Sequence, residues 1–144
     1  MNWTKVQVFV TAALVIIGWW VVNLLAKQRE NKRDQKLREA DAADAKAARK
    51  REFIAFLEGW KAQFDGSNFC GGGRGSHFQK TLPDFSKEAR RIEADFTDAA
   101  KLDAFKSAKN KLTSLTPSAV DDPYDNKGKK LLLKSIQDVI DSIG

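Results

Sequence analysis

The sequence predicts an all-α protein in which an N-terminal transmembrane helix continues into a charged helical stalk and then into a small antiparallel helical bundle. Three observations lead to this fold class. Residues 6–26 (VQVFVTAALVIIGWWVVNLLA) contain no charge, no glycine or proline lies between Trp19 and Glu58, and apolar residues recur at helical spacing from Phe53 onward. The expected divisions are a membrane anchor at 1–26, a stalk at 27–52 and a bundle at 53–144.

The apolar run at 6–26 would be about 31 Å long as a helix, close to the hydrocarbon thickness of a bilayer. A signal peptide usually has a shorter apolar core, of about 7–15 residues. Cleavage after Ala26 would also place Leu24 where a small residue is expected. A body this small could hardly enclose the run as a core helix. We therefore expect an uncleaved anchor with indole rings at the two water–lipid boundaries, those of Trp3, Trp19 and Trp20.

Basic residues follow the apolar run closely, whereas only Lys5 precedes it. The juxtamembrane set is Lys27, Arg29, Lys32, Arg33, Lys36 and Arg38. Because cytoplasmic flanks of membrane spans are enriched in Lys and Arg, we expect a short N-terminus outside and a cytoplasmic body at the inner (plasma) membrane. The lone Cys70 cannot form an internal disulfide, which fits a reducing compartment.

The net charge of +6 is concentrated in the first part of the chain. Residues 1–52 hold eleven Lys and Arg against six Asp and Glu, whereas residues 53–144 hold fourteen against thirteen. The excess therefore lies beside the expected membrane, where it can attract anionic headgroups. The body has no basic stripe interleaved with aromatics, so we expect no nucleic-acid binding.

The stalk at 27–52 is rich in helix-forming residues, and Leu37 is its only large apolar residue. It lacks a sustained a/d heptad, so a strong coiled coil is not encoded. We expect a solvated single helix or a partly disordered spacer.

Four amphipathic stretches make up the expected bundle. The first carries Phe53, Phe56, Leu57, Trp60 and Phe64, and a glycine-rich loop at 65–80 follows it. The second opens at Thr81 with Pro83 in its first turn, and presents Phe85, Ala89, Ile92 and Phe96. The third runs from about Asp98 to Leu115 and ends before Pro117, and the last runs from about Lys127 to Ile143. We interpret the aromatic residues on these apolar faces, which we call the aromatic stripe, as part of the core.

Candidate chemistry is sparse. The segment GGGRGS at 71–76 lacks the preceding strand and the lysine of a phosphate loop, although Arg74 could clamp an anion. Cys70 and His77 share the predicted loop, with Asp65 or Asp84 as a possible orienting acid, but catalysis needs a rigid platform. The acids Asp121, Asp122 and Asp125 lack the spacing of a calcium loop. We expect no catalytic residue, cofactor or metal.

The segments FIAFLEGWKAQF (53–64), LPDFSKEARRIEADF (82–96) and LDAFKSAKNKLTSLT (102–116) cover most of the body. Their apolar spacing resembles that of bacterial or prophage single-pass membrane proteins with a small helical cytoplasmic region and no established activity. The resemblance implies a helical body and a bacterial or prophage origin. It carries over no functional residue, and the glycine-rich insert at 70–76 is not part of its pattern.

These features favour a membrane-tethered, non-enzymatic interaction or scaffold protein whose partners are the lipid bilayer and either another protein or a second copy of itself. No small-molecule substrate is indicated. Two alternatives remain open. One is an envelope-facing phage lysis accessory, similar to an inner-membrane spanin subunit. The other is a membrane-bound enzyme that uses Cys70 and His77.

Overall fold

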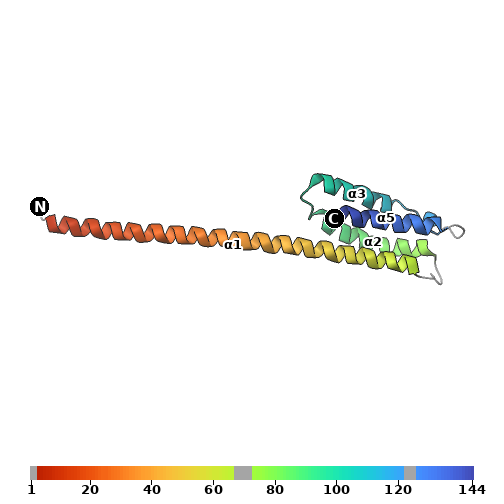
Figure 1. The fold of residues 1–144 in the computed structure, drawn as a ribbon, viewed down its shortest axis with the longest axis horizontal. Coiled ribbons are helices and arrows are strands. Elements are labelled where there is room, and N and C mark those ends of the chain that lie inside the picture. Colours follow the sequence, from red (N-terminus) through yellow and green to blue (C-terminus); the bar gives the residue numbers. More distant parts are fainter. Residues whose placement is uncertain (1–2, 67–72, 122–125) are drawn as a thin grey trace. The chain divides into compact units, whose positions relative to one another are not determined.

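The computed structural model describes residues 3–66, 73–121 and 126–144, which are helical apart from short turns and include no strand. The helices are α1 (Trp3–Gly66), α2 (Arg74–Glu93), α3 (Ala99–Thr113), α4 (Pro117–Val120) and α5 (Lys127–Ile143), shown in Figure 1. The all-α prediction is confirmed. The chain divides into two compact units, Met1–Ala45 and Lys46–Gly144, and α1 contributes residues to both.

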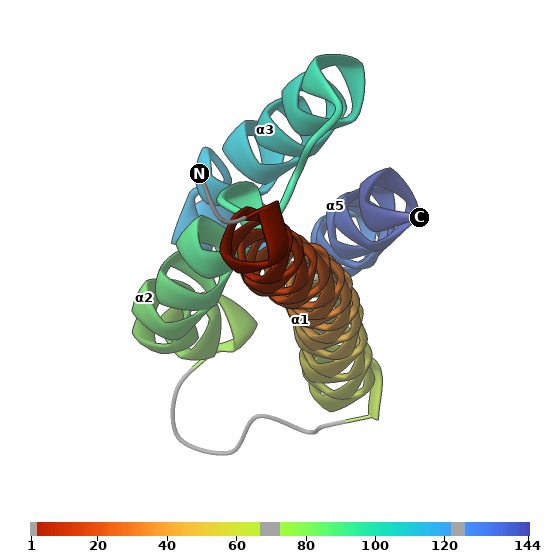
Figure 2. The ribbon, with the colours of Figure 1, turned by 90° about the vertical axis from the view of Figure 1, so that its left-hand side faces the viewer.

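A single hydrophobic core fills the second unit, whose helices are seen from one end in Figure 2. The last part of α1 contributes four of the five residues predicted for its apolar face, namely Phe53, Leu57, Trp60 and Phe64. The other helices contribute Phe78, Phe85, Ala89 and Ile92 from α2, Phe105, Ala108 and Leu112 from α3, Val120 from α4, and Leu132, Ile136, Val139 and Ile143 from α5.

Aromatic rings join α1 to α2 within this core. The Phe85 ring stacks on both Phe53 and Trp60, with centroids 6.1 and 5.4 Å apart, and Phe78 stacks on Trp60 at 5.8 Å. The Trp60 indole also donates a hydrogen bond of 2.9 Å to Thr81 Oγ1. A buried indole N–H needs such an acceptor. Phe53, Trp60, Phe64 and Phe85 are therefore core residues, as predicted. Phe56 and Phe96, predicted for the same apolar faces, are only partly buried against the core, and Phe96 lies beyond the end of α2.

The glycine-rich segment differs from the prediction of a loop at 65–80 and a helix starting at Thr81. The helix α1 continues to Gly66, and α2 already begins at Arg74, so residues 74–80 are helical. Thr81 is therefore not an N-cap, and Pro83 lies inside α2. The predicted boundary is wrong because these glycines do not break the helix: Gly75 lies in its first turn, where its small size allows a close contact.

Two contacts explain why α2 starts where it does. The Gly75 amide donates a 2.7 Å hydrogen bond to Asp121 Oδ1, which satisfies one of the free N–H groups of the first turn. A Cβ on Gly75 would lie 2.3 Å from the Pro117 carbonyl oxygen, so no larger residue fits there. The contacts that allow a helix at 74–80 thus come from residues more than forty positions away.

The remaining boundaries follow local signals. Asp98 caps α3 by accepting a 2.9 Å hydrogen bond from the Ala100 amide, as expected for an aspartate at this position. Thr116, extended with ψ 149°, separates α3 from Pro117 as the rule for residues before proline predicts. The short α4 was not predicted, because four residues carry no helical period. The bounds of α5 agree with the prediction.

Candidate membrane anchor and helical cleft

Within the described residues, α1 is the one helix long and apolar enough to cross a membrane. Its most apolar stretch has a mean hydropathy of 2.3, and none of that stretch is buried. Side chains of this kind would be costly to expose to water, since each large aliphatic side chain is worth about 1.5–3 kcal/mol on burial. By length and composition, the prediction of a candidate membrane span near the N-terminus is confirmed.

Three of the four indoles lie on this part of α1. Trp3, Trp19 and Trp20 are 80%, 67% and 63% exposed, in contrast to the buried Trp60. Sixteen residues of helix separate Trp3 from Trp19, an axial distance of about 24 Å. Two groups of indoles at that separation suit the two boundaries of a bilayer.

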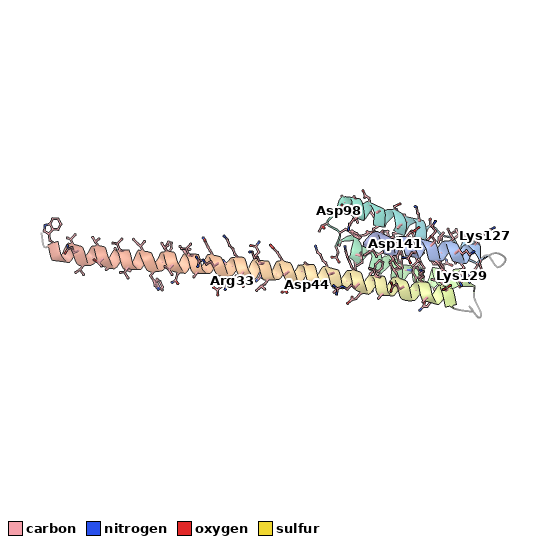
Figure 3. The ribbon with its side chains drawn as sticks, viewed as in Figure 1. Arg33, Asp44, Asp98, Lys127, Lys129 and Asp141 are labelled. Carbon is pink, nitrogen blue, oxygen red and sulfur yellow. The ribbon has the colours of Figure 1, made fainter. Side chains whose placement is uncertain are left out.

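All six juxtamembrane cations lie on α1 and are exposed. They are Lys27, Arg29, Lys32, Arg33, Lys36 and Arg38, of which Arg33 is labelled in Figure 3. Among the described residues, none of the six forms an ion pair or a side-chain hydrogen bond. Their charges are therefore available to groups outside the chain.

In the second unit, Arg49 and Asp95 form a two-point ion pair. Arg49 Nε and Nη2 donate to Asp95 Oδ2 and Oδ1, both at 2.7 Å. The Asp95 side chain is only 7% exposed, so its charge needs this partner. The hydrogen bonds from Arg49 lower the pKa of the Asp95 carboxyl below its ordinary value, although burial acts in the opposite direction. Asp95 is therefore a buried, paired carboxylate and not an ordinary surface charge.

Lys50 and Phe96, which directly follow Arg49 and Asp95 in the sequence, form a second contact beside this ion pair. Lys50 Nζ lies 4.7 Å from the centroid of the Phe96 ring, within the range of a cation–π contact. Two consecutive cations of α1 therefore hold two consecutive residues of the turn after α2. Residues 46–52, predicted as the end of the stalk, belong to the second compact unit.

A cleft of about 350 Å³ lies between α1 and α2 beside this ion pair. Three cations line it, Arg49, Lys87 and Arg91, and so do three acids, Glu52, Asp84 and Glu88. The apolar part of the lining is Phe53, Phe56 and Ile92. Its volume is at the small end of ligand pockets. A cleft with charges of both signs around an apolar floor suits side chains of a partner protein better than a small apolar ligand.

The structure does not place Cys70 and His77 in one described site. Cys70 lies outside the described residues. His77 belongs to α2, where its Nε2 lies 3.4 Å from Gln63 Oε1 and its ring packs edge-on against Phe64. Of the two proposed orienting acids, Asp65 pairs with Lys129 at 2.8 Å, a residue labelled in Figure 3, and Asp84 lies in the cleft.

The Asp121 carboxylate lies at the N-terminal end of α2, beside the glycine-rich segment. The Asp121 carboxylate accepts the Gly75 N–H and crowds Gly73, where a Cβ would lie 2.5 Å from it. An external anion clamped by Arg74 would compete with this carboxylate for the same helix terminus. In residues 3–66, 73–121 and 126–144 no group of three or more acidic, His or Cys side chains could hold a metal ion.

Comparisons with protein-family models, with curated proteins and with solved structures found no match for this chain. They give no family support for a function or for a phage origin.

Two features of the second unit were not predicted from the sequence. The Arg49–Asp95 pair joins residues 46 positions apart, and each residue alone resembles an ordinary surface charge. The cleft needs α1 and α2 placed side by side. A weak signal existed for the pair, since Asp95 lies three residues after the buried Ile92 on the apolar side of α2.

Proposed function

We propose that this chain is a membrane-tethered, non-enzymatic interaction protein. In this proposal the segment at 6–26 anchors the chain in the inner (plasma) membrane, with the N-terminus outside. The second unit acts as a small antiparallel bundle on the cytoplasmic side, where it binds another protein or a second copy of the chain.

One observation carries the proposal. The helix α1 includes both the exposed, uncharged run and, near its C-terminal end, four residues of the core of the second unit. A candidate membrane span and part of a folded unit thus belong to one helix. That combination suits a protein whose folded unit works beside a bilayer.

The lining of the cleft supports the proposal that the second unit binds a protein. Its apolar floor offers Phe56, and its rim offers charges of both signs. Interfaces favour aromatic and arginine side chains at their centres. Phe56 and Arg91 are therefore the residues that we expect a partner to contact.

The proposed orientation rests on the flanking charge and can be tested with the single cysteine. Intact spheroplasts would be treated with a membrane-impermeant maleimide, with lysed cells as the accessibility control. A second probe, Cys70→Ser with Ser107→Cys, uses an exposed position on α3. Labelling only after lysis is expected. Labelling in intact spheroplasts would reverse the orientation and favour an envelope function.

The partner would be sought by crosslinking in membranes followed by solubilisation and pull-down. The wild type is compared with Phe56→Ala and with Leu37→Ala, a change on α1 outside the cleft. We expect a crosslinked species, homomeric or heteromeric, that Phe56→Ala weakens and Leu37→Ala preserves. A strictly monomeric chain that recovers nothing specific would contradict the interaction role.

A further inference from the structure

The cations that follow the apolar run are not spread evenly around α1. At 3.6 residues per turn, Arg29, Lys32, Arg33 and Lys36 fall within an arc of about 100°. Lys27 and Arg38 lie on the opposite side of the helix, about 160–180° from Arg29. We call the first group the basic face and the second side the opposite face.

The two faces also differ in net charge. The basic face carries four cations, and Glu39, three residues after Lys36, lies at its edge. Glu30 lies between the two faces, three residues from both Arg33 and Lys27, and Asp34 lies on the opposite face, four residues from Arg38. The opposite face is therefore close to neutral, whereas the basic face is not.

We propose that the basic face of α1 binds the phosphate groups of anionic phospholipids. This inference rests on the proposed membrane anchor, because it needs residue 26 to lie near the bilayer surface. The enrichment of Lys and Arg that sets orientation requires only their number beside the span. The clustering on one face is additional, and it concentrates four charges on one patch of headgroups.

The direction of the side chains supports this assignment. In an α-helix the Cα–Cβ bonds tilt toward the N-terminus, which here is the side of the apolar run. Arg29 lies about 4.5 Å and Lys36 about 15 Å beyond Ala26 along the axis. Long basic side chains that lean toward the bilayer can bring their charged ends to the headgroup region from this range. Each cation near an anionic surface is worth about fivefold in binding.

The chain offers a matched pair of variants. Arg29→Gln with Lys36→Gln removes one Arg and one Lys from the basic face. Lys27→Gln with Arg38→Gln removes one Arg and one Lys from the opposite face, at the same mean distance from the apolar run. The two variants have equal net charge, so a difference between them reports the face alone.

The experiment measures which lipids surround the full chain. The protein is reconstituted in phosphatidylcholine vesicles that contain a minor fraction of phosphatidylglycerol, with either lipid brominated on its acyl chains. Bromine quenches Trp19 and Trp20, and the ratio of quenching by the two lipids gives the enrichment of the anionic one. We expect wild-type enrichment of at least about twofold, clearly reduced in the basic-face variant, which keeps two of the four cations, and retained in the opposite-face variant.

Other outcomes overturn the inference or the proposal beneath it. Equal loss in both variants, or no enrichment in the wild type, would mean that the face has no role. Enrichment that inorganic phosphate removes, but chloride at equal ionic strength does not, would assign the face to free phosphate instead. A protein that fails to float with the vesicles and is quenched by neither lipid would contradict the membrane anchor itself.

Discussion

Arg49 holds the buried carboxylate of Asp95 through two hydrogen bonds of 2.7 Å, although the two residues are 46 positions apart. The Arg49 side chain remains 45% exposed while that of Asp95 is 7% exposed. The ion pair therefore lets one carboxylate stay charged inside the second unit. It also links α1 to the turn that follows α2.

Asp95→Asn is expected to lower the thermal stability at neutral pH. It should also make the thermal stability depend less on pH in the acid range. The pKa of Asp95 is lowered in the folded state, so its contribution is present above the unfolded pKa of about 3.9 and is lost as the pH falls through the folded value. Thermal unfolding followed by circular dichroism between pH 7 and pH 2 checks this. Asp103→Asn, an exposed change on α3, is the control.

The Arg49→Ala variant completes the test. If the pair acts as a unit, Arg49→Ala and Asp95→Asn should be non-additive in a double-mutant cycle. Additive losses of stability would mean that the contact makes no contribution of its own.

Ile16→Asp is expected to prevent stable membrane insertion, whereas Leu37→Asp should not. The two side chains are almost equally exposed, 65% and 63%, and both lie on α1. Only Ile16 would face hydrocarbon, where an aspartate costs about 2.5–3.5 kcal/mol. Carbonate extraction of membranes and flotation measure the result. Equal behaviour of the two variants would remove the case for a span at 6–26.

Substitution of three glycines by alanine should distinguish the effect of close packing on stability from the effect of helix propensity. Gly75→Ala and Gly128→Ala place a Cβ 2.3 Å from the carbonyl oxygens of Pro117 and Ala119, so each should destabilise the second unit by about 1–3 kcal/mol. Gly59→Ala meets no atom within 4 Å and should stabilise α1 by about 0.5–1 kcal/mol. Denaturant unfolding gives all three values, and the sign for Gly59 is the control.

Asp121→Ala should destabilise the second unit by about 1 kcal/mol, because the Gly75 amide loses its acceptor. Asp121→Asn keeps an oxygen for this hydrogen bond and loses only the charge at the helix end, so its cost should be smaller. Thermal unfolding ranks the two variants. If the first turn of α2 does not depend on Asp121, both will match the wild type, and hydrogen exchange at Gly75 will not change.

Local signals in the sequence were enough for several elements. The bounds of α5, the Asp98 cap and the spacing of Phe53, Leu57, Trp60 and Phe64 follow from periodicity and capping, which depend on neighbouring residues. The apolar run at 6–26 is likewise a local feature of the sequence.

The remaining features of the fold and of the candidate site depend on tertiary contacts. The start of α2 depends on Asp121 and Pro117, so glycines that predict a loop when read alone are instead the positions where helices approach closely. Phe78, assigned to the loop, is a core residue for the same reason. The cleft and the Arg49–Asp95 pair could not be predicted without knowing that α1 lies against α2 and the turn after it.

The close approach of α4 to the first turns of α2 and α5 also determines what a distant relative of this protein must keep. Apolar residues at helical spacing can exchange with one another, and countless helical proteins share them. Positions 75 and 128 accept nothing larger than hydrogen, and position 121 must supply an acceptor. Glycines at positions 75 and 128 together with a hydrogen-bond acceptor at position 121 are therefore a better signature for recognising homologues than the more numerous hydrophobic positions.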